Sequence, residues 1–299
     1  MTTVASLIAQ GFLEENVPLG PLTTYKAGGP ARLVATLETR TQVEQLTATG
    51  LAGELPVLVL GRGSNLVVSD RGFDGLVVRL GGDFSQIAVD GLTVTAGAAA
   101  PLPKVARASV AAGVGGLEFL VGVPGSVGGA IRQNAGCFGS ETVDFLASVE
   151  IAELAGGAIA EYPASDLDLS YRKSNVGSTQ LVLSAVFQGV EGDPQQGSDL
   201  MREITRWRKD NQPGGTFNAG SVFKNPPGST AGEIIDSLGL KGLAVGDVSV
   251  SEKHANFFVA GPGASSDDIH ELVSRVKAAV FEATGTNLEP EIQFVGFEE

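Results

Sequence analysis

The stretch VLVLGRGSNLVVSDRGFDGLVVRL, residues 57–80, decides the fold of this chain. An apolar run at Val57–Leu60 leads into the glycine-rich segment Gly61–Asn65, and two further apolar runs follow it. Apolar runs that alternate with glycine-containing turns are typical of strands joined by tight connections. We therefore expect a strand, a glycine-rich turn, a short strand, a second turn and a third strand.

The segment before this stretch predicts a helix. In TRTQVEQLTATG, residues 39–50, Val43 and Leu46 lie at helical spacing and Gly50 provides a stop signal. A helix that lies between strands makes residues 18–80 a βαβ-like first domain.

Residues 81–210 predict a second domain of mixed helices and strands. The apolar runs TVTAG, ASVEIAEL and LVLSAVF indicate strands, and Pro103 and Gly113 bound an expected helix. SDLMREITRWRKD reads as an amphipathic connecting helix with Ser198 as its cap. The turn-rich segment NQPGG that follows, residues 211–215, marks a boundary.

Residues 211–299 predict a third domain with two capped helices. Thr230 and Glu233 form a T-x-x-E capping box, and Ser265 with Asp268 opens the second helix. Strands at VSVS and NFFVA lie between these helices. The fold class that we expect is α+β.

The composition argues against several classes of function. Of 299 residues 43% are hydrophobic and 18% are charged, and we find no apolar run of about 18 residues that could cross a membrane. The formal charge of −14 argues against nucleic-acid binding, and the acidic MTTVASLIAQGFLEEN argues against a secretory signal. The single Cys137 fits the cytoplasm, and with two histidines the chain has too few ligands for a Cys/His zinc site. We expect a cytoplasmic protein without a metal, nucleic-acid or membrane partner.

Glycine, with 41 residues, gathers in clusters that suit a ligand. In Gly61–Asn65, consecutive small residues can present backbone N–H groups to a diphosphate, although an ordinary tight turn is the alternative. The segment matches neither a Walker A loop nor the G-x-G-x-x-G dinucleotide motif. The apolar stretch GVPGSVGGAIRQNAGCFG at 122–139 reads as a long irregular course of exposed backbone. We favour a covering ligand there over a bare surface loop.

Three polar segments add candidate chemical groups, each with a simpler alternative. Ser221 in NAGSVFKNP is either a turn serine or a proton donor, since no histidine lies near it in the sequence for a hydrolase triad. Arg172 in SYRKS either pairs a carboxylate bidentately or remains a solvated cation. Glu291 in LEPEIQFVG is either a carboxyl group kept protonated by apolar surroundings or an ordinary edge-strand residue. We expect His254 and His270 to be structural or exposed.

Together and in this order, these segments resemble the family of UDP-N-acetylenolpyruvoylglucosamine reductases. The matching segments are TTYKAGGPARL at 23–33, VLGRGSN at 59–65, GVPGSVGGAIRQNAG at 122–136, YRKS at 171–174, NAGSVFKNP at 218–226 and LEPEIQFVG at 288–296. The resemblance implies a two-subdomain FAD-binding module of the p-cresol methylhydroxylase/vanillyl-alcohol oxidase type, followed by an α+β substrate domain.

The resemblance also implies an activity and a site. Members of the family reduce UDP-N-acetylglucosamine enolpyruvate to UDP-N-acetylmuramate in peptidoglycan synthesis, with FAD as cofactor and NADPH as co-substrate. By residue matching, Ser221 would be the proton donor, while Arg172 and Glu291 would hold and polarise the substrate carboxylate. Substrate contacts implied in the same way are Tyr171, Lys224, Asn225 and Asn256. The implied FAD contacts are Gly61, Arg62, Gly63, Ser64, Asn65, Gly122, Val123, Pro124, Gly125, Ser126, Gly128, Gly129, Asn134, Ala135 and Gly136.

Two details of the sequence refine the resemblance. Many oxidases of this superfamily attach flavin through a histidine in the first loop, where this chain has Ser64 and Asn65, so noncovalent FAD is implied. The interval between Arg172 and Ser221 is too short for the insertion that folds a tyrosine over the substrate in some members. The chain therefore resembles the shorter subtype, and we expect a monomer or a weak dimer.

Two other functions stay open on the sequence. One is a flavin oxidase of the same fold, which would act on an alcohol or a sugar lactone and consume oxygen. The other is a noncatalytic nucleotide-binding module, which would gain no colour when it is mixed with FAD.

Overall fold

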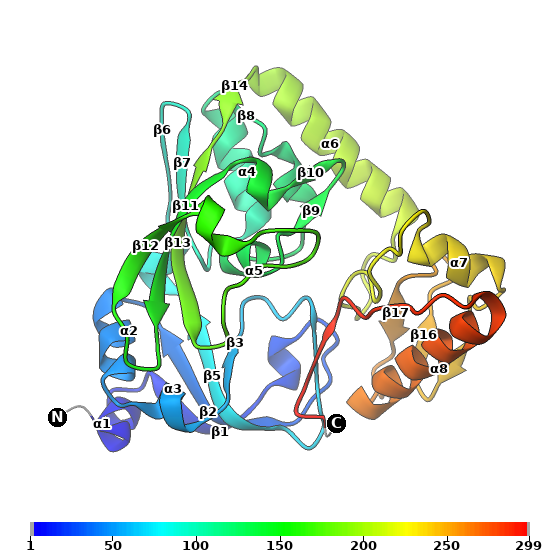
Figure 1. Cartoon of the computed structure of the whole chain (residues 1–299), viewed down its shortest axis with the longest axis horizontal. Coiled ribbons are helices and arrows are strands. Elements are labelled where there is room, and N and C mark those ends of the chain that lie inside the picture. Colours follow the sequence, from blue (N-terminus) through cyan, green and yellow to red (C-terminus); the bar gives the residue numbers. More distant parts are fainter. Residues whose placement is uncertain (1–2, 298–299) are drawn as a thin grey trace. The chain divides into compact units, whose positions relative to one another are not determined.

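The computed structural model describes residues 3–297, and the chain divides into two compact units (Figure 1). The first unit consists of the chain up to Asn16, Leu33–Arg62 and Asp74–Trp207. The second unit consists of Val17–Arg32, Gly63–Phe73 and the chain from Arg208 onward. Within residues 3–297 no helix combines the length and the apolar character needed to cross a membrane.

The first unit contains a four-stranded sheet in the order β1-β2-β5-β3. Strand β3 pairs parallel with β5, with Val57 opposite Leu76. The helix expected before this stretch is α2, which is capped by Thr39 and buries Val43 and Leu46. The elements of this part are α1 (Val4–Ala9), β1 (Leu13–Pro18), β2 (Pro30–Leu37), α2 (Arg40–Thr47), α3 (Leu51–Glu54), β3 (Val57–Val59) and β5 (Phe73–Leu80).

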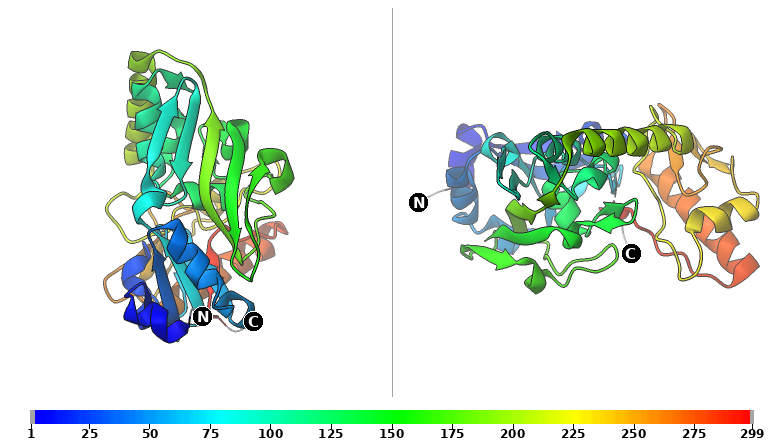
Figure 2. Two further views of the ribbon diagram at one scale, coloured as in Figure 1. Left: turned by 90° about the vertical axis from the view of Figure 1, so that its left-hand side faces the viewer. Right: turned by 90° about the horizontal axis from the view of Figure 1, so that it is seen from above.

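The rest of the first unit is built on a five-stranded antiparallel sheet, β12-β11-β13-β7-β6 (Figure 2). Its strands are β6 (Ile87–Asp90), β7 (Thr93–Gly97), β11 (Leu146–Glu153), β12 (Ile159–Pro163) and β13 (Gln180–Gln188). Its other elements are η2 (Gly82–Ser85), α4 (Leu102–Ala111), β8 (Val114–Gly115), η3 (Glu118–Gly122), α5 (Val127–Arg132), β9 (Gly136–Cys137), β10 (Ser140–Glu141), η4 (Thr142–Asp144), η5 (Ala164–Leu167) and β14 (Val190–Glu191).

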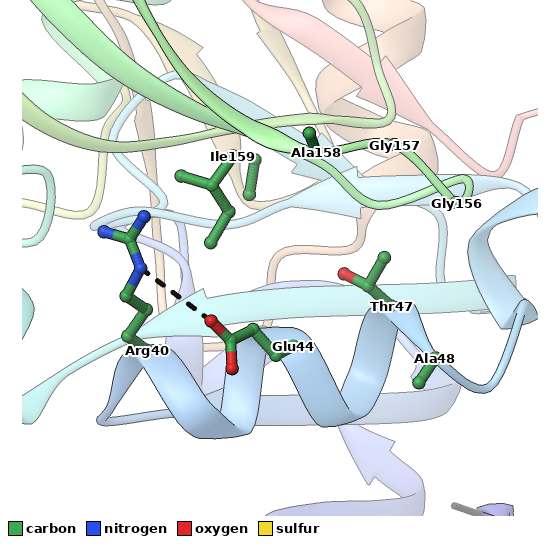
Figure 3. A pocket seen from close by; sticks show the side chains of 9 residues that line it. Arg40, Glu44, Thr47, Ala48, Gly156, Gly157, Ala158 and Ile159 are labelled. Carbon is green, nitrogen blue, oxygen red and sulfur yellow. Dashed lines mark ion pairs between the residues drawn. The ribbon is translucent and has the colours of Figure 1, made fainter.

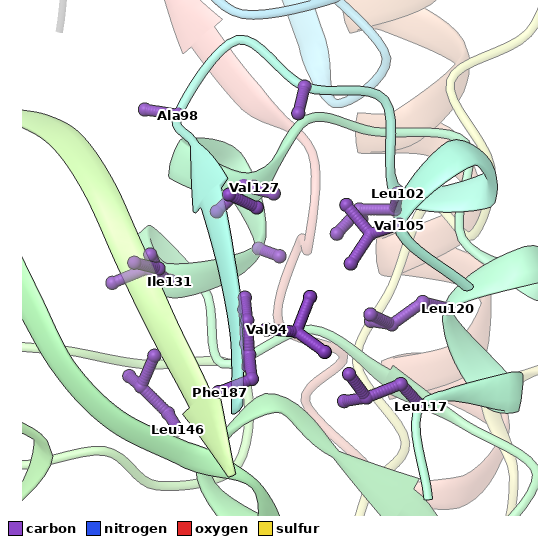
Figure 4. Packing of buried hydrophobic residues seen from close by; sticks show 14 of the residues in the cluster. Val94, Ala98, Leu102, Val105, Leu117, Leu120, Val127, Ile131, Leu146 and Phe187 are labelled. Carbon is purple, nitrogen blue, oxygen red and sulfur yellow. The ribbon is translucent and has the colours of Figure 1, made fainter. Parts of the chain in front are cut away.

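Helices α4 and α5 share one apolar core with this sheet. Phe187 of β13 and Val94 of β7 are buried with Leu102 of α4 and with Val127 and Ile131 of α5 (Figure 4). The predicted strands at TVTAG, ASVEIAEL and LVLSAVF are therefore confirmed, as is the helix that starts near the predicted proline.

The connecting helix begins earlier than the sequence predicted. Helix α6 spans Pro194–Asn211, so Ser198 lies inside the helix and the prediction that it is the cap is wrong. The Asp193 carboxylate accepts a hydrogen bond from the Gln196 N–H at 2.8 Å, which satisfies a donor of the first turn. The Ser198 hydroxyl instead donates to the carbonyl of Pro194.

The second unit combines two capped helices with a small antiparallel sheet, β15-β16-β17. The side chains of Thr230 and Ser265 accept hydrogen bonds from the N–H groups of Glu233 and Asp268, so both predicted capping boxes are confirmed. Strand β18 near the C-terminus pairs parallel with β4. The elements are η1 (Gly20–Leu22), β4 (Leu66–Val68), α7 (Ala231–Ser237), β15 (Ala244–Val245), β16 (Val248–Val250), β17 (Phe258–Ala260), α8 (Ser266–Thr284) and β18 (Gln293–Val295).

A segment near the N-terminus belongs to the core of the second unit. Tyr25 is 1% exposed, and its hydroxyl donates to the carbonyl of Phe258 at 3.3 Å. Burial raises the pKa of this hydroxyl, so the group stays a neutral donor. Tyr25 therefore fastens residues 17–32 to the C-terminal half of the chain.

The two units differ from the division that the sequence suggested. One border between the units lies between Trp207 and Arg208, close to the border expected between the domains 81–210 and 211–299. The last two residues of the domain 211–299 lie outside the described part of the chain. The expected first domain, 18–80, is instead shared between both units, because residues 17–32 and 63–73 fold with the C-terminal part.

A close approach of backbones fixes the part of the first glycine-rich turn that belongs to the second unit, residues 63–65. The Thr24 N–H donates to the carbonyl of Gly63 at 3.0 Å, and the Thr24 hydroxyl donates to the same oxygen at 3.2 Å. Gly63 has a φ of +62°, and a Cβ atom there would lie 2.4 Å from the Leu22 carbonyl oxygen and 2.7 Å from the Thr23 Cα. Only glycine fits this position, because both colliding atoms belong to backbone.

Helix α8 supplies a direct test of the core of the second unit. Leu272 is fully buried, and we expect Leu272→Ala to lower the free energy of unfolding by about 2–5 kcal/mol through lost burial and a cavity. Phe281→Ala on the same helix is the matched control, because that ring is 56% exposed and its loss should cost about 0.5 kcal/mol or less. Urea denaturation measures both, and equal effects would contradict the packing described.

The close approach at Gly63 predicts a second stability difference. Gly63→Ala and Gly239→Ala both place a side chain at positive φ, which costs about 1–2 kcal/mol. Only the first also meets backbone atoms, since the Cβ of the second would have nothing within 4 Å. We therefore expect Gly63→Ala to be the more destabilising by about 1–3 kcal/mol in urea denaturation. A difference near zero would show that the turn relaxes freely.

Candidate active site

The first glycine-rich turn presents a row of backbone donors. Within residues 3–297, none of the backbone N–H groups of Gly61–Asn65 donates a hydrogen bond to another part of the chain. Gly61 and Arg62 are exposed, so a ligand can reach them. Consecutive unused N–H groups beside an arginine form a site for an anionic group such as a diphosphate.

The two glycine-rich segments meet inside the first unit. A Cβ atom on Gly61 would lie 2.6 Å from the Oγ of Ser126. The backbone on both sides of Ser126 is hydrogen-bonded. The carbonyl of Gly125 accepts the N–H of Leu102, and the N–H of Val127 donates to the carbonyl of Ala100. The structure therefore brings together two predicted cofactor segments that are far apart in the sequence.

The second segment is not the long irregular loop that the sequence suggested. Residues Val127–Arg132 form helix α5, since Val127, Ala130 and Ile131 lie at helical spacing and are buried. Many backbone donors of this segment are used inside the protein; the N–H of Gly128, for example, donates to the Ala98 carbonyl at 2.9 Å. The segment 122–139 therefore consists of closely packed backbone, whereas the turn at Gly61–Asn65 has N–H groups that are not used within the described chain.

These observations fit the FAD that the resemblance implies. A dinucleotide needs anion-binding donors and backbone that it can approach closely, and the segments at Gly61–Asn65 and Gly122–Gly136 supply the two features. The turn ends in Ser64 and Asn65 and contains no histidine that could form a covalent bond to flavin.

Asn134 has a structural role that the sequence did not reveal. The residue is fully buried, and its amide donates to the Glu141 carboxylate at 2.9 Å and to the Ser170 carbonyl at 3.1 Å. Its amide oxygen accepts the N–H of Val143 at 2.9 Å. These bonds hold Asn134 within the protein, and its predicted contact with the cofactor stays a prediction.

Arg172 lies in a tight turn of the first unit. Ser170 and Lys173 exchange backbone hydrogen bonds across the turn, at 3.1 and 3.0 Å. Arg172 has a φ of +56°, a left-handed conformation that is uncommon for a residue with a side chain. Its guanidinium donates to the Gly136 carbonyl at 3.1 Å and lies 5.0 Å from the ring centroid of the exposed Tyr171. The arginine is therefore held in a defined direction.

Ser221 lies on a short extended segment of the second unit. It forms an isolated bridge with Phe257, and the next residue, Val222, donates its N–H to the Asn256 carbonyl at 2.9 Å. Ser221 is half-buried and follows Gly220, which has a φ of +76°. The backbone that carries the Ser221 hydroxyl is therefore held by its contacts with Asn256 and Phe257.

Glu291 is joined by backbone bonds to both the serine segment and the first glycine-rich turn. Its N–H donates to the Val222 carbonyl at 2.7 Å, and its carbonyl accepts the Asn65 side-chain amide at 3.0 Å. The N–H of Gln293 donates in turn to the Asn65 carbonyl at 3.0 Å. Three motifs, near residues 65, 221 and 291, thus converge within the second unit.

The remaining predicted substrate contacts lie in the same unit, apart from Tyr171. Lys224 forms an ion pair with Glu289 at 2.6 Å, and the Asn225 amide oxygen accepts the first N–H of α7, that of Ala231, at 3.1 Å. Asn256 is 3% exposed, and its amide bonds with the N–H and the carbonyl of Phe223. The Asn256 amide therefore supports the serine segment, and its predicted contact with the substrate stays a prediction.

Sequence reasoning missed Glu141, whereas it expected His254 to be structural or exposed. Glu141 contacts both Asn134 and Arg172, and its only sequence signal was an acid at the end of a glycine-rich stretch. Burial lowers the pKa of His254, so the ring is kept neutral, and its Nδ1 accepts the N–H of Asn256 at 3.2 Å. His254 therefore has a structural role, as expected.

A separate groove of about 520 Å³ lies between α2 and the β11–β12 turn (Figure 3). Arg40 lines it and is paired with Glu44 at 3.9 Å and with Glu150 at 2.6 Å. None of the predicted site residues lines this groove, and its one cation is already compensated. The groove therefore does not belong to the candidate active site.

Comparisons with known proteins match both parts of this arrangement. Residues 31–162 match the family model of the FAD binding domain, and residues 212–295 match that of the UDP-N-acetylenolpyruvoylglucosamine reductase C-terminal domain. The UDP-N-acetylenolpyruvoylglucosamine reductase of Erythrobacter litoralis is 41% identical over 96% of this chain and 88% of the relative. That of Synechococcus sp. is 41% identical over 96% of this chain and 94% of the relative.

Solved structures agree with the sequence relatives. The UDP-N-acetylenolpyruvylglucosamine reductase of Thermus caldophilus is similar with a TM-score of 0.83 and 38% identity, over 95% of this chain and all of that one. The 6-hydroxy-D-nicotine oxidase of Arthrobacter nicotinovorans, at 13% identity and a TM-score of 0.53, shares the fold alone. The expected α+β fold with an oxidase-type FAD-binding module is therefore confirmed. This chain belongs to the family of UDP-N-acetylenolpyruvoylglucosamine reductases.

Proposed function

We propose that this protein reduces UDP-N-acetylglucosamine enolpyruvate to UDP-N-acetylmuramate, with noncovalent FAD as cofactor and NADPH as co-substrate. The observation that carries the proposal is the convergence at Glu291, whose backbone bonds to Val222 beside Ser221 and to Asn65 of the glycine-rich turn. A cofactor turn, a hydroxyl and a carboxyl group are thus fastened together by the chain itself.

The FAD would be held chiefly by backbone. The unused N–H groups of Gly61–Asn65 and the exposed Arg62 suit its diphosphate, and the packed backbone around Ser126 suits close approach. The other residues predicted in this role are Gly122, Val123, Pro124, Gly125, Gly128, Gly129, Ala135 and Gly136. When bound, FAD supplies the hydride carrier that no amino-acid side chain provides.

Arg172 would bind the carboxylate of the enolpyruvyl group. Hydride addition to the β-carbon leaves negative charge on the α-carbon and its carboxylate, and a cation placed there stabilises the charge as it develops. A guanidinium offers two parallel donors and stays charged throughout. Its bond to the Gly136 carbonyl fixes one part of the group and so limits the directions from which a carboxylate can approach.

Ser221 would deliver a proton to the α-carbon. In this step the O–H bond of serine breaks and a C–H bond forms, which completes the saturation of the double bond. Serine is a weak acid, so it suits a strongly basic, carbanion-like acceptor. The half-buried hydroxyl lies on a segment that Asn256 and Phe257 hold in place.

Glu291 would polarise the same carboxylate. An ionised glutamate would repel the substrate, whereas a protonated one can donate a hydrogen bond to it. Tyr171, Lys224 and Asn225 are the proposed substrate contacts. Lys224 would exchange its exposed partner Glu289 for a substrate anion, because Glu289 is 69% exposed and such a pair contributes little.

The proposed reaction belongs to the synthesis of peptidoglycan precursors. Because both the sugar nucleotide and NADPH are cytoplasmic metabolites, we place the protein in the cytoplasm. Through cell wall biogenesis its activity would bear on cell shape, cell division and the cell cycle.

The role of Ser221 predicts a separation of the two halves of the reaction. In anaerobic stopped-flow measurements, we expect Ser221→Ala to leave the bleaching of the flavin absorption by NADPH within about twofold of wild type. Return of the absorption on adding the enolpyruvyl substrate should slow by about 10²- to 10⁴-fold, the usual contribution of a positioned acid.

The matched control is Ser237→Ala, which removes an exposed hydroxyl that only caps a turn of α7. This variant should match wild type in both phases. If Ser221→Ala slowed both phases equally, or neither, Ser221 would not be the proton donor.

A further inference from the structure

The carboxylate of Glu141 lies between Asn134 and Arg172 in the first unit. Its Oε2 accepts the Asn134 amide at 2.9 Å, and its Oε1 lies 3.9 Å from Nη1 of Arg172. Glu141 stands opposite Gly136 in the β9–β10 pair, and Gly136 is the residue whose carbonyl accepts the Arg172 guanidinium at 3.1 Å. One short hairpin therefore contacts Arg172 through both a carboxylate and a carbonyl.

The orientation of Glu141 is itself fixed. Asn134 is fully buried, and its second donor bond, to the Ser170 carbonyl, ties it to the start of the Arg172 turn. The Glu141 N–H donates to the Asp144 carboxylate at 2.8 Å, which fixes the backbone from the other side. The hydroxyl of Ser174 donates to the Arg132 carbonyl at 2.7 Å and anchors the far end of the turn.

We propose that Glu141 is a positioning residue that sets the direction of the Arg172 guanidinium for the substrate carboxylate. The inference rests on the function proposed above for Arg172. An arginine side chain has several rotatable bonds. If the substrate has to immobilise it, the lost conformational entropy weakens binding. The Glu141 carboxylate restricts Nη1 of Arg172 before the substrate binds, so less entropy is lost on binding.

The pair is partly exposed, which decides how the effect should appear. The Arg172 and Glu141 side chains are 19% and 33% exposed, so their attraction is screened and contributes little to the stability of the fold. The Glu141 charge also opposes a bound carboxylate. A net benefit from Glu141 must therefore come from orientation, and it should be seen only with ligands that carry the carboxylate.

The test compares two sugar nucleotides that differ in that group. UDP-N-acetylmuramate carries the lactyl carboxylate and UDP-N-acetylglucosamine lacks it. Titration calorimetry of each with the oxidised FAD-bound protein, without NADPH, gives the ratio of the two dissociation constants. We expect Glu141→Gln to lower the preference for the carboxylate ligand by about three- to tenfold, the factor that corresponds to ordering one flexible side chain.

Three further variants complete the experiment. Glu141→Asp keeps the charge on a shorter stem and should regain part of the preference. Arg172→Lys removes the planar fork and should lose more of it than Glu141→Gln does. Glu150→Gln breaks another Glu–Arg pair of the first unit, with Arg40, and should leave the ratio unchanged.

The outcomes separate this inference from the proposed function. If Glu141→Gln weakens both ligands equally, or neither, while Arg172→Lys loses the preference, Glu141 does not position Arg172 and the inference fails alone. If wild type itself binds both ligands equally and Arg172→Lys changes nothing, the proposed role of Arg172 fails and this inference fails with it. Should thermal unfolding show that Glu141→Gln does not fold, Glu141→Asp decides in its place. A preference between those of wild type and Arg172→Lys supports positioning, and a preference equal to that of wild type contradicts it.

Discussion

The backbone of Glu291 makes two hydrogen bonds on which the arrangement of the second unit depends. One joins it to Val222, next to the serine, and the other joins it to the side chain of Asn65 in the glycine-rich turn. These two bonds join three segments of the second unit that are far apart in the sequence. Gly63 adds a further contact to this unit. Its positive φ and close backbone neighbours require glycine, and its carbonyl accepts the N–H of Thr24.

A comparable principle organises the first unit around Arg172. Its tight turn is held at one end by Asn134 and at the other by Ser174, and the guanidinium is bonded to Gly136. Asn134 and Gly136 belong to the glycine-rich segment 122–139. Ser126 of this segment lies next to Gly61. The stretch of chain proposed for the cofactor site therefore also holds the Arg172 turn, and buried Asn134 links the two.

Local features could be predicted from the sequence, whereas long-range ones could not. The capping boxes at Thr230 and Ser265 depend on neighbours three residues away, and the structure confirms both. The bond between Asn65 and Glu291 joins residues that no local pattern connects, and helix α5 was hidden by glycines that usually indicate a loop. Family resemblance supplied the site residues, but it could not reveal that Asn134 and Asn256 are buried and hydrogen-bonded inside the protein.

The central claim is that the turn at Gly61–Asn65 belongs to a flavin site that reduces an enolpyruvyl sugar nucleotide. The most direct measurement is the visible absorption spectrum of the wild-type protein without oxygen. We predict a flavin band that NADPH bleaches and that one equivalent of UDP-N-acetylglucosamine enolpyruvate restores. A protein that stays colourless with FAD, or a band that only oxygen restores, would contradict it.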